Sequence, residues 1–236
     1  MPRKLSLRID GELVNAPDGR TILEAARANG KYIPTLCWLE GLTPVGACRL
    51  CMVQVSGMNR LVPACTTPAQ DGMSVATTSP EIARYRRTTI ELLLLERNHF
   101  CAVCVSNTHC ELQDMAASLG VTSVGFHYNY PRLDVDVSHP LYVLDHNRCI
   151  LCTRCVRVCA EIEGAHVWDV SGRGIGSRLV SGLNQPWGAA QDCTGCGKCT
   201  QSCPTGALTK KGFAVAEMVK RNDHISALAA RQGADL

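Results

Sequence analysis

The chain has 236 residues, enough for one large domain or two to three small ones. Its 24 basic and 21 acidic residues are intermixed and give a formal net charge of +3, so the charge pattern does not indicate nucleic-acid binding. The largest apolar stretch, residues 92–95 with its flanks, is far shorter than the roughly 20 residues that span a bilayer. Residues 1–10 lack the apolar core of a signal peptide. We therefore expect a cytoplasmic protein with no membrane span.

Cysteine is unusually abundant, with fifteen residues in a chain whose aromatic content is only 5%. A secreted protein with this cysteine content would be expected to carry disulfides, but the chain has no export signal and the count is odd. In a reducing cytosol, clustered cysteines more often bind metal. The composition therefore predicts a metalloprotein.

The first residues predict a β-hairpin. Apolar and polar side chains alternate in residues 5–9, which is typical of a half-buried strand. Asp10-Gly11 is a turn signal, and residues 12–15 return as the second strand.

A helix and two more strands are predicted to complete this region. Thr21-Ile-Leu-Glu24 has the pattern of a capping box, and Gly30 is placed to end the helix that it begins. Residues 52–55 and 61–64 are further strand candidates. This order of strands and helix predicts a β-grasp sheet.

Two helices are predicted in the middle of the chain. Ser79 is a suitable N-cap and Pro80 a suitable first helical residue, so we expect a helix over residues 81–98. A shorter helix is expected over residues 111–119. The apolar positions of the first helix fall mainly on one side, and they are Ile82, Tyr85, Ile90, Leu93 and Leu94.

Four groups of ligand-type residues account for all fifteen cysteines and one histidine, which makes four sites of four ligands. The groups are Cys37, Cys48, Cys51 and Cys65; His99, Cys101, Cys104 and Cys110; Cys149, Cys152, Cys155 and Cys159; and Cys193, Cys196, Cys199 and Cys203.

The last two groups are a repeated Cys-x2-Cys-x2-Cys-x3-Cys run, the strongest signal in the sequence. Three closely spaced thiolates can bind three corners of one [4Fe–4S] cluster, and in two-cluster ferredoxins the fourth cysteine binds the other cluster. Structural zinc is the alternative, but zinc sites usually use two separated cysteine pairs. Pro204 follows the second run, whereas Ala160 follows the first. We assign Cys149, Cys152, Cys155 and Cys203 to one cluster, and Cys193, Cys196, Cys199 and Cys159 to the other.

The N-terminal group predicts a [2Fe–2S] cluster in a loop beside the β-grasp sheet. Its spacing differs from that of plant-type ferredoxins. Gly46 and Ala47 are small and precede Cys48, so backbone amides there can approach the cluster, which raises its reduction potential. A zinc ribbon is the alternative.

The second group has only three cysteines, so a [4Fe–4S] cluster there needs another ligand. We choose His99, which lies two residues before Cys101. A neutral imidazole in place of a thiolate raises the potential of the cluster. His109 is the rival, but it adjoins Cys110, and neighbouring residues rarely reach one small cluster together.

No catalytic residue is predicted. The glycines at 172–176 lack dinucleotide-binding spacing and are expected to form a loop. Three basic residues lie among the ligands, where they could screen cluster charge, but we expect them to be solvated; they are Arg154, Arg157 and Lys198. The remaining histidines are expected to be structural or exposed, and they are His127, His139, His146, His166 and His224.

The predicted fold class is α+β in five parts. Residues 1–78 form a β-grasp [2Fe–2S] ferredoxin-like domain, 79–120 a small helical [4Fe–4S] domain with one-histidine, three-cysteine ligation, 121–144 a connector, 145–212 a double [4Fe–4S] ferredoxin-like domain, and 213–236 a peripheral, helical tail.

The order of these sites, over roughly residues 5–212, resembles the N-terminal part of the large iron–sulfur subunit of respiratory complex I. It is also similar to parts of FeFe hydrogenases and NAD-dependent formate dehydrogenases. Two features narrow the resemblance: no molybdopterin-type or H-cluster domain follows, and one residue separates His99 from Cys101 where complex I subunits typically have three. With segments 96–104, 145–155 and 181–188, these features resemble the small diaphorase subunit of bidirectional NAD(P)-linked NiFe hydrogenases.

This resemblance implies an electron-transfer subunit with one [2Fe–2S] and three [4Fe–4S] clusters and no substrate site of its own. The implied partners are a diaphorase subunit that binds FMN and NAD(P), and the small and large NiFe hydrogenase subunits, with a further [2Fe–2S] subunit as another candidate. The alternatives are the equivalent subunit of a formate dehydrogenase or another complex I-like enzyme, and a free multi-cluster ferredoxin.

Overall fold

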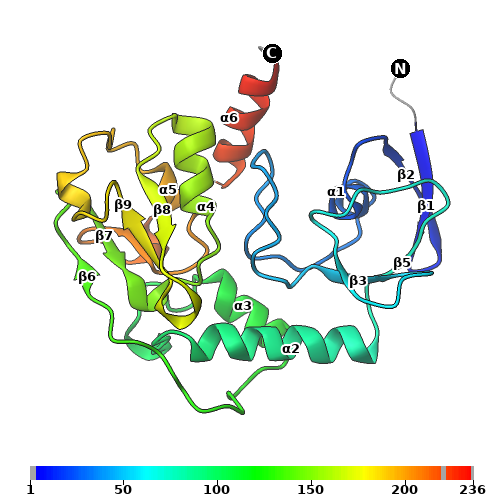
Figure 1. Cartoon of the computed structure of the whole chain (residues 1–236), viewed down its shortest axis with the longest axis horizontal. Coiled ribbons are helices and arrows are strands. Elements are labelled where there is room, and N and C mark those ends of the chain that lie inside the picture. Colours follow the sequence, from blue (N-terminus) through cyan, green and yellow to red (C-terminus); the bar gives the residue numbers. More distant parts are fainter. Residues whose placement is uncertain (1–3, 219–221, 235–236) are drawn as a thin grey trace. The chain divides into compact units, whose positions relative to one another are not determined.

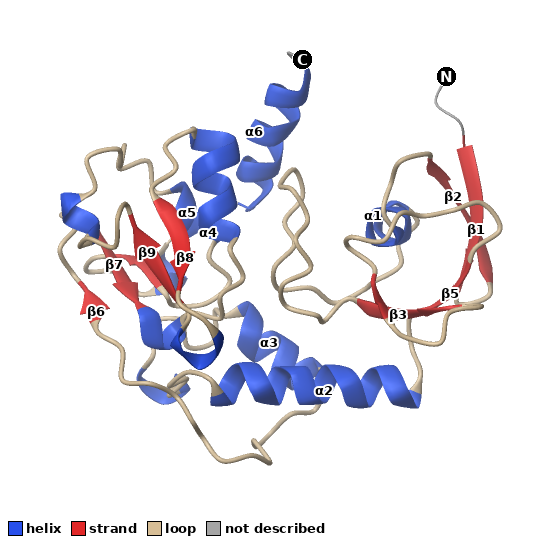
Figure 2. Ribbon diagram, in the orientation of Figure 1, coloured by secondary structure: helices blue, strands red, loops and turns tan. Residues whose placement is uncertain are grey.

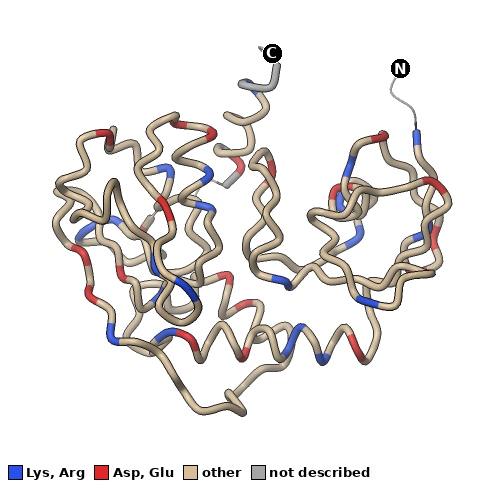
Figure 3. Tube along the Cα trace, viewed as in Figure 1, with Lys and Arg blue, Asp and Glu red and all other residues tan. Residues whose placement is uncertain are grey.

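The computed structural model describes residues 4–218 and 222–234, which form two compact units. The first unit contains the chain up to residue 38 and residues 44–89; the second contains residues 39–43 and the chain from residue 90 onwards. Basic and acidic residues are interspersed along both units (Figure 3). The outermost residues of the predicted N-terminal domain and parts of the predicted tail lie outside the described residues.

A five-stranded mixed sheet forms the frame of the first unit (Figure 1). The predicted hairpin is confirmed: β1 and β2 pair antiparallel and turn at Asp10 and Gly11, both with positive φ. The third strand of the frame, β5, was not predicted, and it lies parallel to β1 and antiparallel to β3. The strands run in the order β2-β1-β5-β3-β4, and they are β1 (Lys4–Ile9), β2 (Glu12–Pro17), β3 (Met52–Val55), β4 (Val62–Pro63) and β5 (Ser74–Ala76).

Helix α1 (Ile22–Ala28) packs its apolar side against this sheet and completes the β-grasp. The predicted capping box is present: the Thr21 hydroxyl accepts from the Glu24 amide, and the Thr21 amide donates to the Glu24 carboxylate at 2.8 Å. Ile22 and Leu23 are fully buried in the core of the unit. The cap therefore fixes where the helix starts and which of its side chains face the sheet.

The long helix α2 (Pro80–Leu95) begins in the first unit and ends in the second. The Ser79 hydroxyl accepts from the Ile82 amide at 3.1 Å, as expected of an N-cap. The expectation that Tyr85 belongs to the apolar side is wrong, because its ring is exposed. Arg86 is buried instead, since its guanidinium donates to the carbonyls of Leu50 and Met52, both at 3.0 Å.

The second unit consists of short strands and short helices joined by long loops (Figure 2). Its helices are α3 (Glu111–Ser118), α4 (Arg154–Arg157), which continues as a π-helical turn (Val158–Glu163), α5 (Lys198–Ser202) and α6 (Asn222–Ala234). Its strands are β6 (Val135–Asp136), β7 (Tyr142–Asp145) and β10 (Leu208–Lys210) in one sheet, and β8 (Trp168–Ser171) and β9 (Arg178–Ser181) in a hairpin. Short 3-10 turns lie at Cys101–Val103, His146–Arg148, Gly174–Gly176, Trp187–Ala189 and Val215–Glu217.

The segments that were predicted to be a connector and a peripheral tail both form part of the packed structure of this unit. The segment expected to be a connector contains β6 and most of β7, which pair with each other, and β7 pairs with β10. The tail is helical, as expected, but Ile225 is fully buried in the core of the unit rather than peripheral. Among the described residues, none of the helices has the length and apolar character of a bilayer crossing.

Candidate metal centres

The first predicted site lies in the loops of the β-grasp unit. Its four members, Cys37, Cys48, Cys51 and Cys65, are all buried. The Cys37 side chain lies within hydrogen-bond reach of Cys48 and Cys65, and Cys51 lies within reach of Cys65. These contacts lower the pKa of the Cys37 thiol and raise the pKa of Cys65. Two strands, β3 and β4, lie between Cys51 and Cys65 in the sequence, and the fold nevertheless brings the four thiols together.

Backbone amides surround this group. Gly46 has a positive φ of 63°, and the turn that it permits directs the amides of Ala47 and Cys48 toward the Cys37 sulfur. The Leu36 amide donates to the Cys48 sulfur at 3.4 Å. Amides therefore approach two of the cysteine sulfurs, and their approach to a bound cluster stays a prediction.

The second predicted group lines a cavity in the second unit. His99, Cys101, Cys104 and Cys110 all contribute to its wall, together with apolar residues such as Leu112. The Nε2 atom of His99 is buried and has no hydrogen-bond partner. The rival, His109, is exposed and its Nδ1 atom lies 3.1 Å from the Thr108 hydroxyl. His99 is therefore the imidazole that this cavity contains.

The charge state of His99 suits a ligand. Burial, followed by the positive charges of Arg148 and Arg97, lowers its pKa to about 4. A backbone hydrogen bond with Leu93 acts in the opposite direction, and because Nε2 has no partner this bond involves Nδ1. Neutral imidazole is the form that binds metals, and the bond at one nitrogen orients the other.

In the third cavity, residues that are far apart in the sequence lie together. It is lined by the thiol-bearing residues Cys149, Cys152, Cys155 and Cys203, and by apolar residues including Leu179 and Leu208. Burial raises the pKa of Cys149 to about 11 and that of Cys152 to about 12. Cys203, from the second cysteine run, lies beside the first three thiols of the first run, where the spacing of the runs had predicted it.

The fourth cavity combines the two cysteine runs in the opposite way. Cys159 lies beside the first three cysteines of the second run, and the wall also contains Trp168 and Trp187. The Val167 amide donates to the Cys159 sulfur at 3.4 Å. The four thiol-bearing residues of this cavity are Cys159, Cys193, Cys196 and Cys199.

The two cysteine runs share one backbone conformation. In the first run, the residues just before and just after the middle cysteine, Leu151 and Thr153, have φ of 52° and 58°. In the second run, Gly195 and Gly197 occupy the same positions with φ of 68° and 70°. These left-handed residues turn the chain so that three successive cysteines face one cavity.

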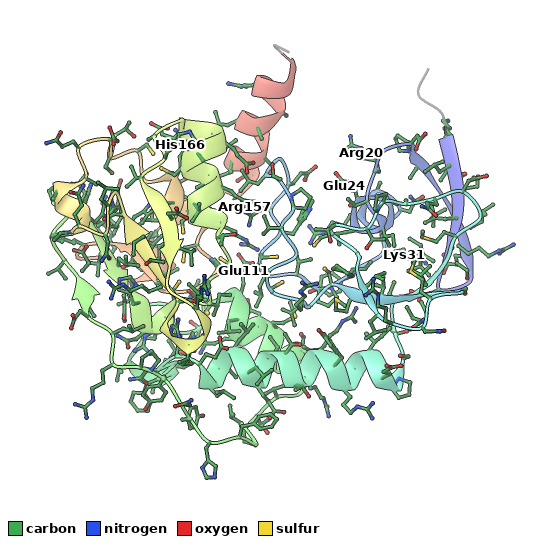
Figure 4. The ribbon with its side chains drawn as sticks, in the orientation of Figure 1. Arg20, Glu24, Lys31, Glu111, Arg157 and His166 are labelled. Atoms are coloured by element: carbon green, nitrogen blue, oxygen red, sulfur yellow. The ribbon has the colours of Figure 1, made fainter. Side chains whose placement is uncertain are left out.

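The arginines near the third cavity are buried, which corrects the expectation that they are solvated. Arg154 donates to both carboxylate oxygens of Glu111, at 2.7 and 2.8 Å. Arg157 donates to the carbonyls of Thr43 and Cys152. Figure 4 labels Glu111 and Arg157 on their elements. Lys198 is partly buried and forms an ion pair with Glu163.

The buried thiols fit iron–sulfur clusters chemically. A buried thiol with a raised pKa stays protonated on its own, whereas a bound metal cation deprotonates it. The apolar walls and amide donors are the surroundings that stabilise thiolates around a cluster. Among the residues that the structure describes, no group of three or more His, Cys, Asp or Glu side chains is placed to hold a single metal ion.

The described histidines that were predicted to be structural or exposed take no part in these sites, with one exception. His127 and His166 are exposed, and His146 is partly buried outside the cavity walls. The side chain of His224 lies outside the described residues. His139 is the exception: it is buried, and its Nε2 atom lies 3.7 Å from the Cys193 sulfur. No ligand spacing connects His139 to a cysteine run, so this contact could not be predicted from the sequence.

Comparison with protein families agrees with this arrangement. Residues 2–80 match the model of a 2Fe-2S iron-sulfur cluster binding domain, residues 86–124 the NADH-ubiquinone oxidoreductase-G iron-sulfur binding region, and residues 139–209 the ferredoxin-like domain of NADH-quinone oxidoreductase subunit 3. The predicted fold class is confirmed by these matches. The fold and the sites thus define an iron–sulfur protein with a 2Fe-2S domain followed by 4Fe-4S regions.

Individual relatives assign the chain to a narrower class of iron–sulfur protein. The gamma subunit of the NAD-reducing hydrogenase HoxS from Cupriavidus necator is 31% identical over 208 residues, which cover 88% of this chain and 87% of that subunit. The chain belongs to the family of these hydrogenase gamma subunits. A crystal structure of NAD+-reducing [NiFe]-hydrogenase contains a chain with a TM-score of 0.85 and 38% identity, and the match covers 95% of this chain and 96% of that one.

Longer proteins contain a similar region. The alpha subunit of the NADPH-Fe(3+) oxidoreductase of Geobacter sulfurreducens is 38% identical over 209 residues, which cover 89% of this chain but only 24% of that subunit. The chain therefore spans about a quarter of the length of this relative.

Proposed function

We propose that the chain is the electron-relay subunit of the diaphorase module of a bidirectional NAD(P)-linked NiFe hydrogenase. The observation that carries the proposal is the composition of three cavities, each lined by one complete set of four predicted ligands. Family membership supports the same function, because two of the relatives named above, the HoxS gamma subunit and the chain of the solved structure, belong to NAD-reducing hydrogenases.

The proposed ligands are the sixteen residues of the four groups, with His99 as the one imidazole. We propose one [2Fe–2S] cluster in the β-grasp unit and three [4Fe–4S] clusters in the second unit. Clusters of this kind supply one-electron transfer when bound. The five sequence segments with boundaries at 78, 120, 144 and 212 remain our proposal for the domain division.

The residues between the sites support a relay. Thr205 lines both the cavity of His99 and the cavity of Cys149, so the walls of these two sites share a residue. Cys155 and Cys159 lie one turn apart on α4 and its π-helical continuation, and they face the third and fourth cavities. Three adjacent sites in one unit suit electron hopping, and we assign no catalytic residue to the chain.

The proposed partners are a diaphorase subunit that binds FMN and NAD(P) and the small and large NiFe hydrogenase subunits, with a further [2Fe–2S] subunit as another candidate. We propose that the complex is cytoplasmic. The equivalent relay subunit of a formate dehydrogenase or other complex I-like enzyme and a free ferredoxin would bind the same clusters but differ in their partners.

Anaerobic affinity purification from native cells, followed by mass spectrometry, tests the proposal. We expect a flavoprotein and both NiFe hydrogenase subunits to co-purify with the chain. A molybdenum-dependent formate dehydrogenase subunit in their place would assign the relay to another enzyme. Recovery of the chain alone as a monomer would favour a free carrier.

A further inference from the structure

Two ring nitrogens outside the cysteine runs approach one sulfur atom of the fourth site. The indole Nε1–H of Trp187 donates to the Cys193 sulfur at 3.4 Å. The Nε2 atom of His139 lies 3.7 Å from the same sulfur. Cys193 is partly buried, whereas Trp187 and His139 are 1% and 6% exposed, so both contacts are shielded from water.

The backbone determines which nitrogen of His139 carries the proton. The amide of Leu141 donates to His139 Nδ1 at 3.1 Å, so Nδ1 is an acceptor. In a neutral imidazole the proton is then on Nε2, the atom that faces Cys193. His139 is thereby held in the tautomer that donates toward the sulfur.

A stack of rings fixes both donors. The His139 ring lies 4.6 Å from that of Trp187 and 4.9 Å from that of Tyr142, and Trp168 meets Trp187 edge-on at 4.7 Å. The Trp187 amide donates to the Asp136 carboxylate at 2.7 Å. The next residue, Gly188, lies so close to the Ser138 backbone that an added Cβ would be 2.4 Å from its carbonyl oxygen. The donors therefore belong to a rigid structure.

We infer that Trp187 and His139 set the reduction potential of the cluster bound by Cys159, Cys193, Cys196 and Cys199, by donating two N–H groups to the Cys193 thiolate. This inference rests on the proposed function. Reduction adds negative charge to a cluster, and hydrogen bonds to its sulfur ligands stabilise that charge, so each donor raises the potential. Both residues act through Cys193 and are positioning residues.

Trp187→Phe tests the inference, because it keeps an aromatic ring in the stack and removes the N–H. His127→Phe is the control: it makes the same change as His139→Phe at an exposed histidine that lies outside the walls of the described cavities. The measurement is a redox titration of the purified complex followed by EPR. We expect Trp187→Phe and His139→Phe each to lower the midpoint potential of one [4Fe–4S] signal, and the control to leave all signals unchanged.

An unchanged potential in Trp187→Phe with an intact signal would overturn the inference but leave the proposed function in place. If Trp187→Phe loses the cluster, His139→Phe decides, and loss of the cluster in both variants would assign a purely structural role to the two rings. Absence of [4Fe–4S] signals from the unmodified complex would contradict the proposed function itself.

Discussion

His99 differs from the other fifteen proposed ligands in charge. It is neutral, because burial and two arginines lower its pKa to about 4, whereas each cysteine ligand would bind as an anion. A site with one imidazole and three thiolates has one negative charge fewer than its neighbours. A less negative cluster accepts an electron more readily. As the proposed ligand, His99 would therefore give its site a higher potential than the sites with four cysteines.

Replacement of this imidazole by a thiolate tests the assignment. We expect His99→Cys to retain a cluster and to lower its midpoint potential, because the new ligand adds negative charge. A redox titration followed by EPR measures the change, and His109→Cys is the control because His109 is exposed. An unchanged potential and spectrum in His99→Cys would remove His99 from the ligand set.

A second prediction at the residue scale is that the last cysteine of each run binds the cluster of the other run. Cys159 lines the cavity of the second run, so Cys159→Ala should damage the cluster bound mainly by residues 193–199. Cys203→Ala should damage the cluster bound mainly by residues 149–155. EPR and Mössbauer spectra of the two variants should lose different signals. Loss of the 149–155 cluster in Cys159→Ala would contradict the assignment.

At the scale of elements, the capping box of α1 predicts a pH dependence. Burial alone would raise the pKa of Glu24, but hydrogen bonds from the Thr21 amide and hydroxyl, with Arg20 nearby, lower it below the usual value. A lowered pKa in the folded state contributes stability above the unfolded pKa, and this stability is lost as the pH falls through the folded pKa.

The variant Glu24→Gln keeps a capping side chain and removes its charge. At pH 7 we expect it to lower the free energy of unfolding by about 0.5 kcal/mol. The difference between variant and wild type should shrink as the pH falls below the ordinary glutamate range. Thermal unfolding midpoints of both proteins between pH 7 and about pH 3 test this, because the range must extend below the lowered pKa of Glu24, and loss of clusters in acid affects both proteins alike. A difference that does not depend on pH would mean that the charge of Glu24 is not stabilising.

Helix α2 supports the first cysteine site through Arg86. The buried guanidinium donates to the carbonyls of Leu50 and Met52, the residues on either side of Cys51. Arg86→Leu leaves both carbonyls without these donors, so we expect a loss of about 2 kcal/mol of stability and faster loss of the [2Fe–2S] cluster on heating. The visible absorbance of the cluster and the unfolding midpoint measure both effects. Arg84→Leu on the same helix is exposed and should change neither.

At the scale of the whole molecule, repeated and strongly patterned features were predictable from the sequence. The hairpin, the capping box, the N-cap at Ser79 and the grouping of thiols across the two cysteine runs all depend on local spacing. Strand β5 was missed because its three residues bury only Val75, which is too short a pattern to show alternation. The assignment of ligands to clusters stays a prediction.

Contacts between distant segments account for the other differences between the predictions from the sequence and the structure. Arg86, Arg154 and Arg157 were expected on the surface or were not considered, because an arginine in a sequence gives no sign of the partners that permit its burial. Most of their partners are backbone carbonyls, and every residue has such a carbonyl. The contact of His139 with Cys193 is of the same kind, since the loop before β7 and the second cysteine run meet only in the folded chain.

One such contact joins two of the proposed sites. Glu111 follows Cys110 of the histidine site, and Arg154 lies between Cys152 and Cys155 of the neighbouring site. Arg154 also donates to the Ser202 carbonyl, next to Cys203. Its guanidinium is buried, whereas the Glu111 side chain is 38% exposed. The ion pair therefore links the segments that carry the proposed ligands of both sites, and it balances a buried positive charge.

Glu111→Gln removes the negative charge of this ion pair and leaves the Arg154 guanidinium buried without a countercharge. We expect a loss on the order of 2 kcal/mol, less than for a fully buried pair because Glu111 is partly solvated. The EPR signals of both the histidine-site cluster and the Cys149 cluster should decay together on heating, before those of the wild type. Asp114→Asn, an exposed change on the same helix, is the control. Decay of one signal alone would show that the pair stabilises a single site rather than the junction between two.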